Sequence, residues 1–158
     1  MPINKDEFRA ALGRFASGVT VVTLKDAGGN LHGITVSAFC SVSLDPPLIL
    51  VCIEKAAGSH HAFAENEVFV VNILRESQQH YSDQFASYLP EKFDGIEFEM
   101  NIDGVPILKN TLASLECRLT NAHDSGDHTI FIGLVEKSFV ADEQPLIYYH
   151  GSYRKLGV

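Results

Sequence analysis

Apolar and polar residues alternate along many short stretches of the chain, which is the period-two pattern of β-strands. The alternation is clearest at residues 113–120, where every second residue is Ser, Glu, Arg or Thr. Residues 48–53 are instead apolar throughout, which favours a strand buried on both faces. The strands expected from these patterns span residues 19–24, 31–42, 48–53, 68–74, 113–120, 129–140, 145–149 and 153–156.

Helical spacing of apolar residues occurs in only a few places. Asn4 and Glu7 have the spacing of a capping box, and the apolar Phe8, Leu12 and Phe15 follow at helical intervals. This pattern predicts a first helix over about residues 5–15.

Two more short helices are expected, at residues 59–65 with Ser59 as N-cap and at residues 77–88. The second of these has three aromatic residues on one face: Tyr81, Phe85 and Tyr88. Turn residues at 26–30 and 125–128 connect neighbouring strands as hairpins. Many strands, few helices and no regular alternation of the two predict a mainly β fold, an antiparallel barrel with short covering helices.

The overall composition narrows the class of protein. At 158 residues and 46% hydrophobic content, the chain is expected to form one folded, soluble domain over residues 1–158. The formal charge of −8, without a run of Lys or Arg, makes nucleic acid a poor partner. No stretch reaches the roughly 20 apolar residues of a membrane span, and acidic residues near the start are unlike a secretory signal. We therefore expect a cytoplasmic protein without a membrane partner.

Several common functional motifs are absent from the sequence. The three cysteines are widely spaced within apolar runs, so we expect them to be buried and inert: Cys40, Cys52 and Cys117. The seven histidines show no ligand spacing, and no metal site is expected. Gly28 and Gly33 have phosphate-loop spacing, but Ile34 stands where lysine is required, and no GxGxxG follows a strand. A dinucleotide would therefore have to bind outside a Rossmann fold.

The most informative segment is residues 33–47, where small hydroxyl residues interrupt an apolar strand. A flat ring needs small neighbours, and its carbonyl edge and phosphate need hydrogen-bond donors. Four hydroxyl groups and one small side chain meet that need: Thr35, Ser37, Ser41, Ser43 and Ala38. Taken alone, the same composition also describes an ordinary half-exposed strand.

This segment resembles the flavin-binding strand and turn of the flavin reductases that form the FMN-binding split barrel. The turn Gly126–Asp127–His128 and the strand after it resemble a second motif of that family, and residues 146–156 resemble its C-terminal strand pair. The matches follow the family's order from about Phe8 to Leu156. The resemblance implies a split antiparallel β-barrel with Greek-key connections.

The resemblance also implies a set of site residues. His128 is implied as the catalytic residue that contacts the nicotinamide, with Tyr149 in the wall beside it, although any of the C-terminal tyrosines is a candidate. Residues 54–60 resemble the flavin-phosphate loop. Taken alone, Ser59 is also a plain N-cap, Lys55 a surface charge, Phe85 a core residue and Gly126–His128 an ordinary turn. The implied cofactor-binding residues are Thr35, Val36, Ser37, Ala38, Ser41, Val42, Ser43, Cys52, Glu54, Lys55, Ser59, His60, Phe85, Ala86, Asp127, His128 and Tyr149.

The activity implied by the resemblance is hydride transfer from NADH or NADPH to FMN or FAD. It further implies a homodimer that binds flavin near the subunit interface and supplies reduced flavin to a partner monooxygenase. The alternative is a non-catalytic split-barrel protein that stores or senses flavin or binds haem. An oxidase similar to the pyridoxamine-phosphate oxidases fits less well, because the Gly–Asp–His turn points to the reductases.

Overall fold

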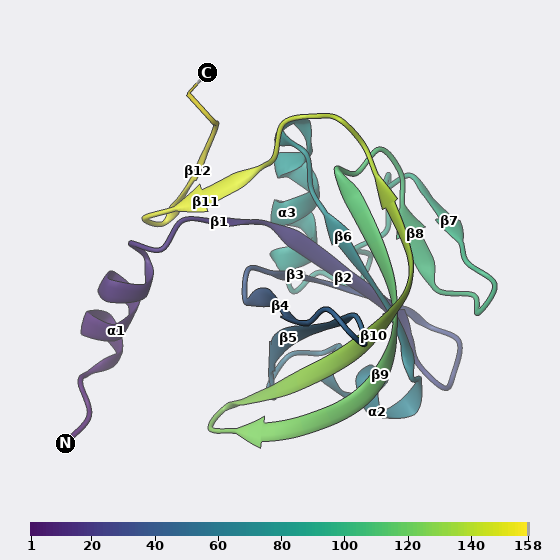
Figure 1. Ribbon diagram of the computed structural model, residues 1–158, viewed down its shortest axis with the longest axis horizontal. Coiled ribbons are helices and arrows are strands. Elements are labelled where there is room, and N and C mark those ends of the chain that lie inside the picture. Colours follow the sequence, from purple (N-terminus) through teal and green to yellow (C-terminus); the bar gives the residue numbers. More distant parts are fainter. Residues whose placement is uncertain (158) are drawn as a thin grey trace.

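The computed structural model describes residues 1–157, and its centre is a seven-stranded antiparallel sheet (Figure 1). The strands lie in the order β3–β2–β6–β9–β10–β5–β4. This arrangement confirms the mainly β, antiparallel class that the sequence predicts. The bounds are β2 (Thr20–Lys25), β3 (Leu31–Val36), β4 (Phe39–Ser43), β5 (Leu48–Glu54), β6 (Val68–Ile73), β9 (Ala113–Ser125) and β10 (His128–Val140).

The two edge strands of this sheet, β3 and β4, follow each other in sequence and are joined by Ser37 and Ala38. The sheet curls so that its inward side chains form one apolar core, with Val51, Phe63 and Phe69 at most 1% exposed. The barrel is split where β3 passes into β4. The expected single strand over 31–42 is therefore two strands, because the chain must turn from one sheet edge to the other.

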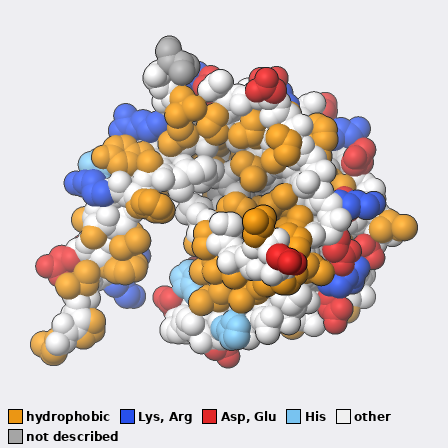
Figure 2. Space-filling view, viewed as in Figure 1, with side chains coloured by type: hydrophobic (Ala, Val, Ile, Leu, Met, Phe, Trp, Pro, Cys, Tyr) orange, Lys and Arg blue, Asp and Glu red, His pale blue; other side chains and the backbone are white. Residues whose placement is uncertain are grey.

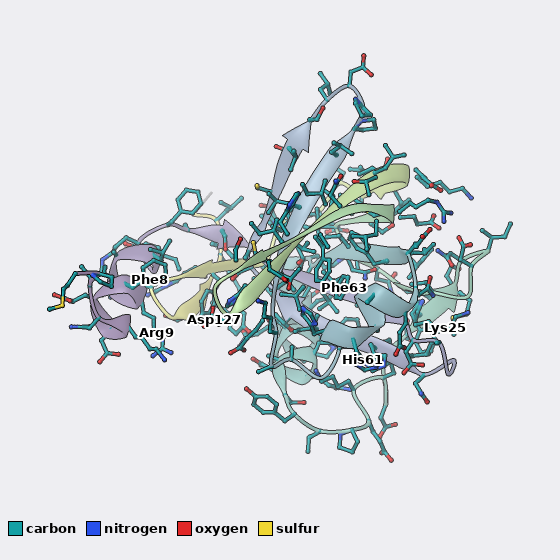
Figure 3. The ribbon with its side chains drawn as sticks, turned by 90° about the horizontal axis from the view of Figure 1, so that it is seen from below. Phe8, Arg9, Lys25, His61, Phe63 and Asp127 are labelled. Atoms are coloured by element: carbon teal, nitrogen blue, oxygen red, sulfur yellow. The ribbon has the colours of Figure 1, made fainter. Side chains whose placement is uncertain are left out.

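Shorter elements surround the barrel: β1 (Ser17–Gly18), β7 (Phe98–Met100), β8 (Pro106–Leu108), β11 (Ile147–Tyr149), β12 (Ser152–Arg154), α1 (Lys5–Leu12), α2 (His60–Glu65), the 3-10 turn η1 (Glu76–Gln78) and α3 (Gln79–Ala86). Strands β1, β11 and β12 form one small sheet, and β7 pairs with β8. Helix α3 packs on β3 and β2, and α2 inserts Phe63 against the barrel strands (Figure 3). In the part of the chain described, no helix combines the length and apolar content needed to cross a bilayer.

Helix α1 begins as predicted but is shorter than predicted. The Asn4 side chain accepts hydrogen bonds from the amides of Asp6 and Glu7, and Glu7 caps the Asn4 amide in return. The helix ends at Leu12, and Phe15 lies beyond it. None of its residues is buried, and it projects from the barrel as an arm (Figures 1 and 2).

The structure corrects the predicted burial of β5, of Tyr88 and of two cysteines. Residues of β5 alternate between buried and half-buried, so one face of this strand is covered and the other is not. Tyr88 lies beyond α3 and is fully exposed, whereas Tyr81 and Phe85 are buried as expected. Cys117 is buried, but Cys52 is half-buried and Cys40 is exposed, because both lie near the edge of the sheet.

Candidate functional site

Part of the predicted site forms a cavity of about 240 Å³ between β3 and α3. Thr35 donates its hydroxyl proton to the carbonyl of Ser82 over 2.7 Å, which ties the strand to the helix. The Ser82 hydroxyl in turn shares a hydrogen bond of 2.6 Å with Tyr153. The residues lining the cavity are Val19, Thr35, Ser37, Ser82, Ala86, Tyr148 and Tyr153.

Close packing between β3 and α3 determines the shape of this cavity. Gly33 faces the ring of Phe85, and a Cβ at that position would overlap the ring. Phe85 itself is 0% exposed and also contacts Phe93 edge-on. The Phe85 side chain is therefore a packing residue in this chain, and it is the neighbouring Ala86 that faces the cavity.

Tyr153 lines the cavity, and its hydroxyl is hydrogen-bonded to Ser82. It also donates to the Asp83 carboxylate over 3.2 Å. Burial raises the pKa of this phenol, since the charged phenolate would lose its hydration. Tyr153 therefore stays neutral and acts as a hydrogen-bonding group rather than as a base.

A second group of predicted residues meets where β5 ends and β10 begins. Glu54 and His128 lie opposite each other in the sheet, and the Lys55 amide donates to the Asp127 carbonyl over 2.9 Å. His128 is 44% exposed, and its Nδ1 lies 2.7 Å from the Asp127 carboxylate. The hydrogen bond from His128 lowers the pKa of Asp127. The Lys55 ammonium lies 3.8 Å from Asp124 at the same turn.

Ser59 and His60 adjoin this second group. Ser59 stands at the N-cap position of α2, but its side chain makes no capping hydrogen bond. Its hydroxyl is buried without a hydrogen-bond partner among the residues described, which is costly unless a ligand supplies one. His60 is engaged by Thr129, with 2.9 Å between Nε2 and the hydroxyl. The amides of Ala57 and His60 donate to loop carbonyls, so the loop has fewer donors for a phosphate than the sequence implied.

Strand β4 distributes its predicted residues over both faces of the sheet. Cys40 is opposite Leu50, and Ser43 is opposite Leu48, so both share the outer face with Cys52 and His128. Ser41 is opposite Ile49 and faces the other way, because an irregularity separates Ser41 from Ser43. Val42 lies at this irregularity and is 45% exposed.

The two groups are neighbours on the sheet but do not share the cavity. The Ala38 carbonyl accepts a hydrogen bond from Cys52, and Cys52 lies two residues before Glu54, the partner of His128. Two strand spacings and two residues put the Cα atoms of Ala38 and His128 about 12 Å apart. His128 does not line the cavity that holds Thr35 and Ser37. Val36 is only 5% exposed, so it offers its backbone rather than its side chain.

The structure shows which of the C-terminal tyrosines, left open by the sequence, line the cavity. Tyr148 and Tyr153 line the cavity, whereas the predicted Tyr149 lies beside His150 and its place in a binding site stays a prediction. Tyr148 and Tyr153 are directly opposite each other in the β11–β12 pair. A hairpin turn at His150–Gly151 places the two tyrosines on the same face of the strand pair, and this turn is the signal in the sequence that could have identified them. Ser82 gave no such signal, because only the packing of α3 on β3 directs it to Thr35.

Comparison with known proteins supports one family over nearly the whole chain. Residues 12–157 match the family described as "Flavin reductase like domain". The chain is 43% identical to the FMN reductase (NADH) SmoA of Agrobacterium fabrum, over 95% of this chain and 85% of that protein. It is 40% identical to HsaB of Rhodococcus jostii, the reductase subunit of a flavin-dependent monooxygenase, over 96% and 77% of the two chains.

Solved structures agree with the sequence comparison. The NADH:FAD oxidoreductase SgcE6 of Streptomyces globisporus, in complex with NAD and FAD fragments, superposes with a TM-score of 0.92 and 31% identity over 98% of this chain and 93% of that one. A protein of Sinorhizobium meliloti described only as an oxidoreductase gives a TM-score of 0.94 and 36% identity over 98% of this chain. This chain spans only 54% of that protein.

Proposed function

The chain belongs to the flavin reductase-like domain family, and from this premise we propose that it is an enzyme that transfers hydride from NADH to FMN or FAD. The observation that carries the proposal is the 43% identity to an NADH-dependent FMN reductase over 95% of the chain. The family match over residues 12–157 supports the proposal that residues 1–158 form one such domain. We also propose, from the sequence alone, that the protein acts in the cytoplasm. The similarity to the reductase speaks for the enzyme and against the non-catalytic storage or sensor protein.

The residues present fit a flavin and a nicotinamide. When bound, the reduced nicotinamide supplies a hydride and the flavin ring accepts it, so the protein has only to bind and align the two. The unpartnered hydroxyl of Ser59 and the ammonium of Lys55 are suited to a phosphate. The cavity of about 240 Å³ is smaller than a typical ligand pocket, so it would take one part of a ligand and leave the rest on the open sheet face.

His128 has the geometry for the nicotinamide side of the site. Asp127 accepts the hydrogen bond from Nδ1, which orients the ring and leaves Nε2 to a ligand. The imidazole would hold a carboxamide or phosphate group, and no proton needs to move through it during hydride transfer. Its role is therefore to position the nicotinamide.

Turnover of the purified protein tests this function. Dialysed protein mixed with NADH should oxidise it only after FMN or FAD is added, as followed at the nicotinamide absorbance band. NADPH replaces NADH in a parallel series, which gives four cofactor pairings. Absence of oxidation in all four pairings would contradict the enzyme. If flavin stays bound through gel filtration without any oxidation, the storage protein is the better description.

The product of this reaction points to a partner. Relatives include the reductase subunit of a flavin-dependent monooxygenase, so we propose that this chain also supplies reduced flavin to a separate oxygenase. An exchanging flavin would need a site open to solvent, and Glu54, Lys55 and Asp127 are all exposed. Gel filtration should then separate added flavin from the protein.

We also propose that the chain acts as a homodimer, since two apolar surfaces lack cover. Helix α1 exposes Phe8, Leu12 and the adjacent Phe15 by 55%, 53% and 81%, although an isolated eight-residue helix is marginal in water. Where β5 pairs with β10, the outer face carries half-buried apolar side chains, namely Leu48, Leu50, Ile130, Ile132 and Leu134. Figure 2 shows hydrophobic side chains both on the arm and over this part of the barrel. A second copy would cover both.

Light scattering during gel filtration measures the oligomeric state. The unaltered chain should elute as a dimer, and Leu12→Glu should shift it toward the monomer because a charge would be buried at the contact. The matched control is Arg9→Glu, which changes charge on the same helix at a polar position. A monomeric unaltered chain would overturn the dimer and leave the proposed activity untouched.

A further inference from the structure

Three potential metal ligands meet beside α2, and one of them, His32, lines the same cavity as Ser59. Asp26 directly follows β2, His32 lies in β3, and His61 lies in α2. One ligand atom from each lies within 4.8 Å of the other two. Figure 3 shows His61 on α2, farther from α1 than Asp127 is. None of the three belongs to the predicted site.

Two of the three separations between these ligand atoms bracket the value for a tetrahedral metal ion, and the third, between the two nitrogens, is at most 4.8 Å. His32 Nε2 and His61 Nε2 lie 2.9 and 3.7 Å from the same carboxylate oxygen of Asp26. Bonds of 2.0–2.2 Å at tetrahedral angles put neighbouring ligand atoms about 3.3–3.5 Å apart, between these two values. The two imidazole rings are nearly perpendicular, with centroids 5.0 Å apart, so their Nε2 atoms can approach one point without the rings clashing.

The carboxylate is held in place by groups other than the two histidines. The amide and side chain of Asn30 donate to Asp26 over 2.9–3.2 Å, which orients it as outer-shell partners orient metal ligands. The Asp26 side chain is only 9% exposed, whereas that of His61 is 51% exposed, so the cluster is rigid on one side and reachable from solvent on the other.

The surrounding charges also favour a cation. Glu65 lies one helical turn after His61 and accepts a hydrogen bond from the amide of Ala27, next to Asp26. The nearby Lys25 directs its ammonium to the carbonyl of Asp103 instead of to this cluster. A second carboxylate is thus close, and the adjacent ammonium is engaged elsewhere.

We propose that Asp26, His32 and His61 bind one divalent transition-metal ion of the zinc class, with solvent as the fourth ligand. Two imidazole nitrogens and one carboxylate oxygen are the donors that such ions accept. The ion would replace the proton between His32 Nε2 and Asp26, and the imidazole would keep its remaining proton on Nδ1. Because the ligands come from β2–β3 and from α2, the bound ion would fasten α2 to the barrel.

This proposal goes beyond hydride transfer and stands without it. The ion would support the structure, because it would join α2, whose His60 contacts Thr129, to β2 and β3. Its binding would, however, limit the movement of α2, whose first turn follows Ser59. The sequence did not lead us to expect a metal site, since the three ligands are separated by 6 and 29 positions and match no ligand motif.

Cobalt and zinc binding to the untagged protein test the site. We expect one Co²⁺ per chain, with the intense visible absorption of tetrahedral coordination, and displacement by one Zn²⁺ in equilibrium dialysis. Zinc at a hundred times its dissociation constant should raise the unfolding temperature by about 5 °C or more. His61→Ala should weaken zinc binding about a hundred-fold and abolish the cobalt spectrum.

Two variants keep the test interpretable. His80→Ala removes an exposed histidine from α3 and should leave both metals bound as before. His32→Gln retains polarity if His61→Ala disturbs α2, and circular dichroism without metal shows whether each variant is folded. Absence of stoichiometric metal binding would overturn the site. Binding that is unchanged in the folded His61→Ala and His32→Gln variants would overturn it as well, and the three residues would then form only a hydrogen-bonded turn. The flavin assay is a separate measurement, so the two proposals can fail independently.

Discussion

The cavity between β3 and α3 and the turn between β9 and β10 are both lined by residues of the predicted flavin site, yet they are built differently. Around the cavity, hydrogen bonds already join Thr35 to Ser82 and Ser82 to Tyr153. Gly33 has no side chain and leaves room for the Phe85 ring. At the turn, His128 is partly exposed and its ring is hydrogen-bonded to Asp127. The side chains of the first region therefore stabilise the fold even where they line a cavity that can take part of a ligand, whereas the side chain of His128 in the second is available to a ligand. Substitutions in the first region should therefore lower stability, whereas substitutions in the second should lower activity.

The largest effect is expected from Gly33→Ala. The added Cβ would overlap the Phe85 ring, and relief of that overlap should cost about 1–3 kcal/mol of unfolding free energy. Gly18→Ala is the control, because nothing lies within 4 Å of the added atom there. Urea unfolding measures both variants. Equal stability of the two would mean that the β3–α3 contact is loose.

His128→Ala should lower activity and leave stability nearly unchanged, which is the reverse of the effect of Gly33→Ala. We expect a fall of about ten-fold in kcat/KM for NADH, equivalent to about 1.4 kcal/mol, from loss of one hydrogen bond to the nicotinamide. Flavin affinity, measured by fluorescence, and the unfolding temperature should stay nearly unchanged. In the control His80→Ala, kcat/KM for NADH, flavin affinity and the unfolding temperature should all stay nearly unchanged. A parallel loss of flavin affinity would place His128 against the flavin instead.

Tyr153→Phe should cost about 1 kcal/mol of unfolding free energy, because the hydroxyl shared with Ser82 and Asp83 disappears while the ring remains. Tyr148→Phe is the matched control from the facing ring, 5.4 Å away. No hydrogen bond to its hydroxyl is found within residues 1–157. If both variants lose the same stability, the hydroxyl network is not what joins the C-terminal hairpin to α3.

The smallest effect concerns pH and Cys117. Burial raises the pKa of this thiol to about 12, from an ordinary value of 9. Its contribution to stability is complete below pH 9 and declines from there toward pH 12, since only the unfolded chain ionises in that range. At pH 9 the free energy of unfolding should be about 0.4 kcal/mol lower than at neutral pH on account of this thiol, and Cys117→Ala should not show this decrease.

A thiol reagent offers a direct check on the same cysteine. Cys40 should react first, Cys52 more slowly and Cys117 only after unfolding, following their exposure. Prompt reaction of all three thiols in the folded protein would contradict the burial of Cys117.

Several elements could be predicted because their signals are local. The capping box at Asn4, the hairpin turn at residues 26–30 and the alternation in β9 depend on neighbours in sequence, and all three are present. The end of α1 and the break at Ser37 could not be predicted in the same way. They depend on where the chain must leave one sheet edge and join the other.

The sequence by itself therefore determined the class of fold, the place of most of the longer strands and the motifs that identify the family, but not the short strands β1, β7 and β8. Only the tertiary structure decided which hydroxyls are already engaged, which tyrosines face the cavity and that Asp26, His32 and His61 meet. The physical reason is that periodicity reports on which side of its own strand or helix a residue lies. Which residue of another element lies opposite is decided by strand register and by the packing of helices on the barrel.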